Sequence, residues 1–180
     1  MRAGLRRLMV WVLVAIIAVV GLAVFAVIVG LFLPPEHVAS RTLRVERPPE
    51  VIWQVITDYA DQPIWRSELS AIERLPDRQG HQVWRERHQQ GRPITLEIAE
   101  TIRPRRLVTR IADEGGPFSG RWEFDITPAG SGSQVTITEF GRLPNPFFRF
   151  VSRFIIGQTA FIEQYLSGLA SKFGEPATIN

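Results

Sequence analysis

Two glutamates fall at positions from which strand geometry would point a carboxylate into the protein interior. In a strand predicted over residues 93–102, Glu100 lies on the face that carries alternating isoleucine and leucine side chains. In a strand over residues 134–142, Glu139 shares the face of valine and isoleucine, because successive side chains alternate between the two faces of a strand. Two inward carboxylates could hydrogen-bond the polar end of a ligand or serve as general acid and base. The alternative is that each lies in water near a strand end or pairs with an inward arginine.

Large aromatic side chains are predicted on the same inner faces. Any one of them alone is most simply core packing, but together they could also line an apolar cavity between a sheet and a helix, the usual place for a small-molecule site. With the two glutamates, they form the candidate ligand-binding set: Trp65, Glu100, Trp122, Phe124, Glu139, Phe154, Phe161 and Tyr165.

Other site chemistries find no support in the sequence. The three histidines, His37, His81 and His88, have no metal-ligand spacing, and the chain contains no cysteine that could supply a thiolate ligand, a nucleophile or a disulfide. Neither a glycine-rich phosphate loop nor a G-x-S-x-G nucleophile motif occurs. The net charge of +3 comes from scattered arginines that carboxylates nearly balance. We therefore predict no metal, no cofactor and no nucleic-acid partner.

The strands and helices that must position these residues are predicted from the periodicity of apolar residues and from turn residues. An initial strand at 38–46 and a helix over about 50–58 precede period-two patterns with short turns, which predict an antiparallel meander. The N-cap Asn145 and the C-terminal glycine Gly174 bound a predicted helix of about 28 residues, whose apolar stripe only the inner face of the sheet could cover. The six meander strands are predicted at 68–75, 82–89, 93–102, 106–113, 118–127 and 134–142.

The N-terminus carries a different pattern. Residues 8–33 form an uncharged and almost wholly apolar run, which would extend about 39 Å as a helix against a hydrocarbon core of about 30 Å. The run is longer than the apolar region of a cleaved signal peptide and ends in bulky residues, which favours an uncleaved transmembrane helix over a signal peptide. Arg2, Arg6 and Arg7 favour a cytoplasmic N-terminus and an extracytoplasmic domain at the inner or plasma membrane, although arginines after the run nearly balance the count.

Three segments of the chain resemble a known superfamily. They are Pro49-Glu50-Val51-Ile52-Trp53-Gln54-Val55-Ile56-Thr57-Asp58-Tyr59 with Pro63 and Trp65, then Phe118-x-Gly120-x-Trp122, then Val135-Thr136-Ile137-Thr138-Glu139. Over residues 38–174 the chain resembles the SRPBCC, or START-like, superfamily of polyketide cyclases/dehydrases and lipid-transport proteins. The resemblance implies an α+β helix-grip fold, in which a seven-stranded antiparallel sheet wraps around a long C-terminal helix. Its members include carriers and enzymes, so the resemblance alone does not choose a function.

The sequence therefore predicts three parts and a class of function. Residues 1–37 hold the N-terminal tail, the transmembrane helix and a linker, residues 38–174 form the helix-grip domain, and residues 175–180 form a tail. The expected function is membrane-anchored binding of a hydrophobic small molecule or lipid in a cavity between sheet and helix, with the bilayer as partner of residues 8–33. The competing hypotheses are a cyclase, dehydratase or hydrolase that uses the same cavity, and a stress or assembly module whose core is filled.

Overall fold

The computed structural model describes residues 2–113 and 115–180, but not the side chains at positions 2, 3, 5 and 8, Arg2 of the orientation argument among them. The chain forms two compact units. The first contains the N-terminal residues through Pro35 together with Leu143–Gly157, and the second contains Glu36–Arg142 and Gln158–Asn180. A segment inside the predicted helix-grip range thus belongs to the same unit as the apolar N-terminal helix.

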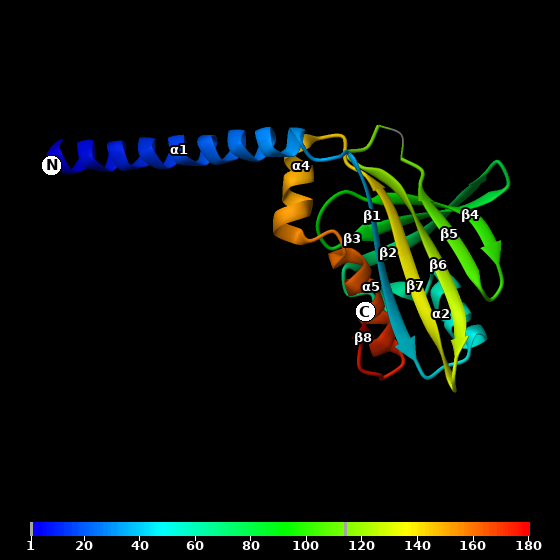
Figure 1. Cartoon of the computed structure of the whole chain (residues 1–180). Coiled ribbons are helices and arrows are strands. Elements are labelled where there is room, and N and C mark those ends of the chain that lie inside the picture. Colours follow the sequence, from blue (N-terminus) through cyan, green and yellow to red (C-terminus); the bar gives the residue numbers. More distant parts are fainter. Residues whose placement is uncertain (1, 114) are drawn as a thin grey trace. The chain divides into compact units, whose positions relative to one another are not determined.

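An eight-stranded antiparallel sheet dominates the second unit (Figure 1). Its strands lie in the order β2-β3-β4-β5-β6-β7-β1-β8. Strands β2 to β7 form the predicted meander, and the first strand of the chain, β1, pairs with β7. The α+β class is confirmed, and the predicted C-terminal tail contributes the short eighth strand, which pairs with β1. The strands are β1 (Glu36–Val45), β2 (Leu69–Arg78), β3 (His81–His88), β4 (Ile94–Ile102), β5 (Arg106–Ile111), β6 (Ser119–Ala129), β7 (Gly132–Arg142) and β8 (Thr178–Ile179).

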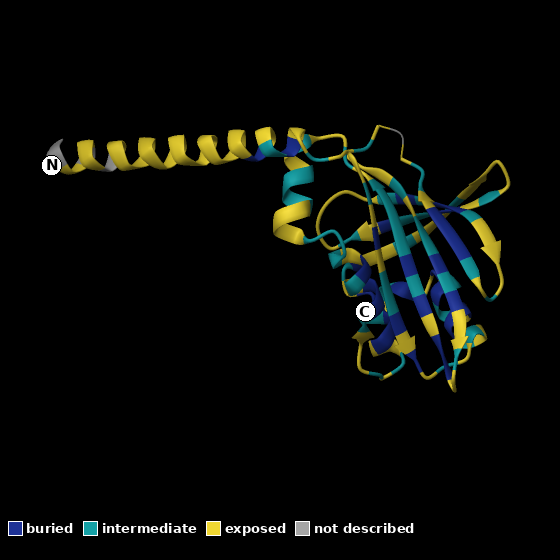
Figure 2. Ribbon diagram, in the orientation of Figure 1, coloured by how far each residue is buried: buried dark blue, intermediate teal, exposed yellow. Residues whose placement is uncertain are grey.

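Alternating side chains separate a covered face of the sheet from a wet one. In β6, Phe124 and Ile126 are buried, whereas Asp125 between them forms an ion pair with Arg106 of the neighbouring strand. Figure 2 shows the same alternation of buried and exposed positions along the central strands. This pattern is expected when one face of an antiparallel sheet packs on a core and the other faces water.

Three helices cover the inner face. Two prolines precede and begin α2 (Pro49–Thr57), where they cost no hydrogen bond, and α3 (Gln62–Trp65) follows as a single turn. The last helix, α5 (Ala160–Lys172), buries residues at a spacing of three to four and so presents one apolar face to the sheet. The core residues of these helices are Ile52, Trp53, Ile56, Trp65, Ile162, Tyr165, Leu166, Leu169 and Ala170.

The predicted single helix of about 28 residues is wrong. The region instead contains α4 (Pro146–Val151), a short π-helical segment η1 (Ser152–Ile156) and α5. Gly157 ends the π-helical segment with a φ of 90°, a conformation that glycine adopts freely and other residues rarely do. The chain therefore breaks at Gly157, and only the part after it contributes to the core of the second unit.

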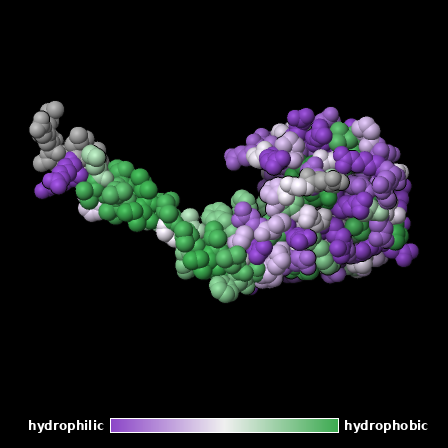
Figure 3. Space-filling model, turned by 90° about the horizontal axis from the view of Figure 1, so that it is seen from above, coloured by the Kyte–Doolittle hydropathy of each residue, from purple (hydrophilic) through white to green (hydrophobic). Residues whose placement is uncertain are grey.

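The first unit contains α1 (Arg2–Leu31), a helix long and apolar enough to cross a membrane. Its apolar stretch Met9–Leu31 has 23 residues and a mean hydropathy of 3.3, so it would extend about 34 Å. The rest of the chain leaves nearly all of its described side chains exposed. Figure 3 shows this stretch as a hydrophobic rod. Either a membrane anchor or a signal sequence fits these properties.

Candidate functional site

The inner face of the sheet changes from apolar to polar along its strands. Strand pairing places side chains in transverse rows, and the row that joins Ile126, Val135 and Leu43 is completely buried. Two rows further along, Trp122 pairs directly with Glu139. The predicted inward direction of Glu139 is thus confirmed, and its carboxyl lies two rows from the completely buried apolar row.

Four of the predicted ligand-binding residues meet around one ring. Tyr165 of α5 makes edge contacts with Trp65, Trp122 and Phe124, at centroid distances of 5.3, 5.9 and 5.4 Å. Such edge-to-face arrangements are the favourable ones for aromatic rings. Tyr165 is therefore the centre of an aromatic group between α5 and the sheet.

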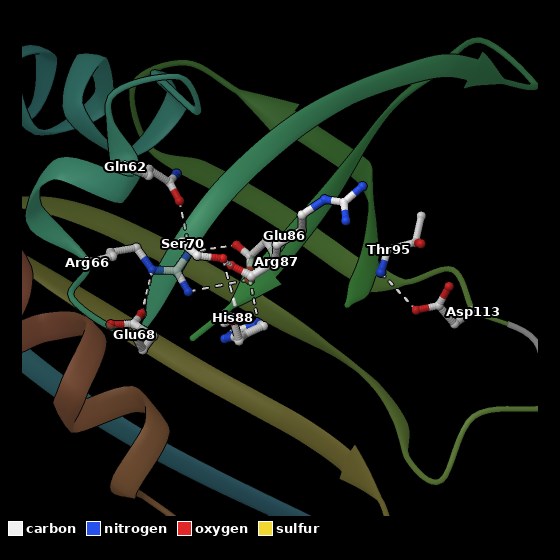
Figure 4. A network of polar contacts seen from close by, with 9 residues as sticks. All are labelled: Gln62, Arg66, Glu68, Ser70, Glu86, Arg87, His88, Thr95 and Asp113. Carbon is white, nitrogen blue, oxygen red and sulfur yellow. Dashed lines mark hydrogen bonds and ion pairs between the residues drawn. The ribbon is translucent and has the colours of Figure 1, made fainter. Parts of the chain in front are cut away.

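A buried charged pair lies against Tyr165 of this aromatic group. Figure 4 shows the polar contacts of the pair. Arg66, which follows α3, donates from Nη1 to Oε1 of Glu86 in β3 at 2.6 Å and to Oε1 of Gln62 at 2.8 Å. Its Nε donates to Oε1 of Glu68 at 2.7 Å, and its Cζ lies 5.0 Å from the centroid of the Tyr165 ring. Two carboxylates, an amide and an aromatic ring therefore hold the planar guanidinium in one orientation.

The charges of this pair are stable at neutral pH. Burial opposes the ionised form of Glu86, but the His88 imidazole and the Arg66 guanidinium outweigh it and hold the pKa of this carboxyl below its usual value. Burial also opposes the charge of Arg66, yet Glu86 raises the pKa of the guanidinium above its usual value. The pair is consequently suited to orienting a polar group and not to exchanging protons.

Some buried hydrogen-bond donors of the second unit have no partner among the described residues. Tyr59 follows α2 and stacks on Trp84 of β3, with ring centroids 4.7 Å apart. Burial raises the pKa of the Tyr59 hydroxyl, so this group keeps its proton. Among the described residues, the Tyr59 hydroxyl and the indole nitrogens of Trp65 and Trp84 are buried without a hydrogen-bond partner. Buried donors in native proteins are rarely left unpaired.

Glu139 has the opposite electrostatic character to Glu86. Its Oε1 lies 3.4 Å from Nε2 of His37 in β1, and its Oε2 is buried with no hydrogen-bond partner among the described residues. Burial raises the pKa of the Glu139 carboxyl, and the nearby His37 and Trp122 side chains offset only part of the rise. A carboxyl with a raised pKa keeps its proton to a higher pH than usual, and when protonated it could donate a hydrogen bond or a proton to a bound molecule.

The predicted inward direction of Glu100 is wrong. The pairing of β4 with β5 shifts register between Ile98 and Glu100, because the strand bulges there, and a bulge reverses which residues face the core. Glu100 is therefore exposed and lies 3.3 Å from Nε of Arg106, which also pairs with Glu123. It belongs to an ion-pair network on the outer face of the sheet.

Phe154 and Phe161 do not lie on the inner face as predicted. Phe154 is exposed and belongs to the first unit, where its ring contacts Phe150 at a centroid distance of 5.1 Å. Phe161 lies in α5 but is exposed, because the buried stripe of this helix runs through Ile162 and Tyr165. The error at Phe154 follows from the predicted continuous helix, which the structure breaks at Gly157. Phe161 lies within α5 beyond the edge of its buried stripe, so its spacing of four residues from Tyr165 did not ensure burial.

A surface hollow of about 560 Å³ lies elsewhere in the second unit and is bordered by none of the predicted ligand-binding residues. The hollow is lined by Arg44, Glu46, Arg47, Phe173, Gly174, Glu175, Pro176 and Thr178.

Within the residues that the structure describes, no group of three or more histidine, aspartate and glutamate side chains could hold a metal ion.

Comparison with known proteins agrees with this architecture. The sequence pattern of the family described as polyketide cyclase / dehydrase and lipid transport matches residues 36–174. The chain belongs to this family. No curated protein sequence matches it significantly.

Several solved structures are similar to the chain. A protein from Thermus thermophilus has 21% sequence identity and a TM-score of 0.60, over 77% of this chain and 96% of that one. The Zhui aromatase/cyclase from a Streptomyces species has 15% identity and a TM-score of 0.60, over 76% and 93%. A START superfamily protein from Mycobacterium smegmatis has 16% identity and a TM-score of 0.60, over 76% and 96%. At these identities the likeness establishes the fold alone.

Sequence reasoning missed four polar residues of the interior between the sheet and its helices: His37, Arg66, Glu86 and His88. Glu86 could have been found, because it lies two residues after Trp84 and so shares its face of β3. His88 carries the same signal, since it lies four residues after Trp84 on that face, whereas His37 and Arg66 carry none. His37 was assigned to a linker but lies in β1, and Arg66 meets Glu86 only through tertiary contact across 20 residues.

Proposed function

We propose that this protein binds a hydrophobic small molecule or lipid whose oxygen atoms meet the polar groups of the interior. The observation that carries this proposal is the set of three buried, unpaired donors, on Tyr59, Trp65 and Trp84, within an aromatic interior. Leaving a buried donor unpaired costs about 1–3 kcal/mol. A mostly apolar ligand with carbonyl or hydroxyl oxygens would remove that cost while it buries its carbon skeleton.

The ligand is expected to appear in native mass spectrometry of the full-length protein released from detergent micelles. Wild type should carry a discrete adduct, one per chain. Tyr59→Phe keeps the ring but removes the hydroxyl, so it should weaken binding by roughly 2–10-fold, the value of one hydrogen bond. Trp11→Phe, in the apolar helix, is the control. An adduct pattern that consists of bulk lipids and is the same in all three proteins would contradict the proposal.

A cyclase or dehydratase activity is the second candidate, favoured by the carboxyl of Glu139 with its raised pKa. One of the structurally similar proteins is named as an aromatase/cyclase. Glu139 would then donate a proton to a departing hydroxyl group. In the mass-spectrometric experiment, Glu139→Gln should leave the adduct within a few-fold of wild type if the residue only orients the ligand. If it is an acid catalyst, conversion of that ligand should fall by about 100-fold or more.

We further propose that α1 is an uncleaved anchor and that the second unit is extracytoplasmic, at the inner or plasma membrane. The length of the apolar stretch and the arginines before it support this arrangement. The full-length chain of 20.4 kDa should remain in the membrane fraction, and protease added to spheroplasts should digest its second unit. A shorter, soluble product would indicate a signal peptide, and survival of the second unit while a periplasmic marker is digested would reverse the orientation.

A further inference from the structure

The first unit joins α4 tightly to the C-terminal end of α1. Among the described side chains of α1, the two buried positions are Ala26 and Gly30, four residues apart and thus on one face. A Cβ atom built at Gly30 would overlap the backbone of Pro146. About one turn before Gly30 in α1 and one turn after Pro146 in α4, the rings of Phe25 and Phe150 meet edge to face at 6.1 Å. Small residues of this kind allow two helices to approach closely in a membrane.

Arg149 of α4 binds the carbonyl groups where α1 ends. Its guanidinium donates to the carbonyl oxygens of Gly30 and Leu33 at 3.4 and 3.3 Å, and to those of Leu143 and Pro144 at 2.8 and 2.6 Å. The last carbonyls of a helix have no partner within the helix, and a cation is favourable there. The single guanidinium thus fixes α4 to the end of α1.

The joined segment presents apolar side chains that nothing in the first unit covers. Phe154 is 58% exposed and Ile155 68% exposed, and Phe147, Phe148 and Ile156 are also exposed. Residues 143–157 contain two arginines and no acidic residue. Figure 1 shows α4 running across the axis of α1, not along it. A helix placed across a membrane-spanning helix lies parallel to the membrane plane.

We propose that residues 143–157 form an interfacial element that lies in the lipid headgroup boundary at the C-terminal end of α1. The apolar stretch of α1 ends at Leu31, so the residues around Gly30 that contact α4 reach the edge of the hydrocarbon core. The exposed phenylalanine and isoleucine side chains then enter the acyl region, and the arginines lie at headgroup level, as in other interfacial helices. This inference rests on the proposed anchor function of α1.

Spin labels test the depth of this element directly, because the chain has no cysteine and each substitution creates a single labelling site. The full-length protein would be reconstituted into vesicles of phosphatidylcholine and phosphatidylglycerol. Labels would be placed at Phe148→Cys and Phe154→Cys, with Val20→Cys as the control within the span and the exposed Gln90→Cys as the control in water. Collision rates with oxygen and with a water-soluble nickel chelate then report depth.

We expect the oxygen-to-nickel ratio at positions 148 and 154 to be several-fold above that at position 90 and below that at position 20. A water-like ratio at 148 and 154 with a lipid-like ratio at 20 would overturn the interfacial element and leave the anchor intact. A water-like ratio at position 20 would overturn both. Low accessibility to both reagents at 148 and 154 would indicate a second protein chain in place of lipid, which also contradicts the inference.

A matched pair of glycine variants tests the joint itself. Gly30→Ala places a methyl group against Pro146, whereas Gly21→Ala meets nothing within 4 Å. In the Phe154→Cys background, Gly30→Ala should increase the mobility of the label and change its oxygen-to-nickel ratio, while Gly21→Ala should leave both unchanged. Identical spectra from the two variants would show that the contact with α1 does not position the element.

Discussion

Glu86→Leu should lower the free energy of unfolding of the second unit by about 3–5 kcal/mol, because it leaves the buried Arg66 without its closest carboxylate. Only 6% of the Glu86 side chain and 9% of the Arg66 side chain are exposed, so water cannot replace the lost partner. The measurement is denaturant unfolding of the full-length protein in micelles, followed by tryptophan fluorescence.

A double-variant cycle separates the ion pair from simple loss of packing. Arg66→Met combined with Glu86→Leu should be less destabilised than Glu86→Leu alone, because no uncompensated charge remains. The recovery of stability should be incomplete, because Arg66 also donates hydrogen bonds to Gln62 and Glu68. Glu73→Leu, which breaks the exposed pair with Arg87, is the control and should change stability by no more than about 0.5 kcal/mol. Strict additivity of the two buried variants would contradict the coupling.

The same pair predicts how stability depends on pH. Because the pKa of Glu86 is lower in the folded protein than in the unfolded chain, its stabilisation is present above the unfolded pKa and is lost as pH falls through the folded one. The stability difference between wild type and Glu86→Leu should therefore shrink in acid. Glu139 acts in the opposite sense, since its pKa is raised and its cost to stability disappears as the carboxyl becomes protonated.

Local patterns predicted most of the sheet because each strand carries its own information. The alternation in β6 and β7 indicates which side chains are buried without reference to any other part of the chain, and it placed Trp122, Phe124 and Glu139 correctly. The strand order followed from the short turns between neighbours. Alternation along a strand predicts burial only where the strand keeps its regular geometry.

The errors arose where one residue changes the geometry. The bulge after Ile98 turns Glu100 outward, although the sequence continues to alternate. At Gly157, a glycine that a helix could tolerate instead takes a positive φ and ends it. The Arg66–Glu86 pair was beyond reach for another reason: it joins the end of α3 to β3, and nothing in either segment alone indicates that the two meet.

Tyr165→Ala should lower the free energy of unfolding by about 3–5 kcal/mol, the usual cost of removing a buried aromatic ring. Tyr165 is 4% exposed and contacts three rings and the Arg66 guanidinium, so its loss opens a cavity at the centre of the interior. Tyr165→Phe, which keeps the ring, should recover most of the loss. Both would be measured by the same denaturant unfolding.

Phe161→Ala provides the matched control, because it removes an aromatic ring from the same helix one turn earlier. Phe161 is 59% exposed, so its removal should change stability by no more than about 0.5 kcal/mol. The two rings lie four residues apart in α5, but the buried stripe is centred on the side of Ile162, Leu166 and Leu169, so Tyr165 lies within it and Phe161 beyond its edge. Equal losses would contradict the exposed position of Phe161, whereas a large difference would show that α5 packs on the sheet through the face of Ile162 and Tyr165.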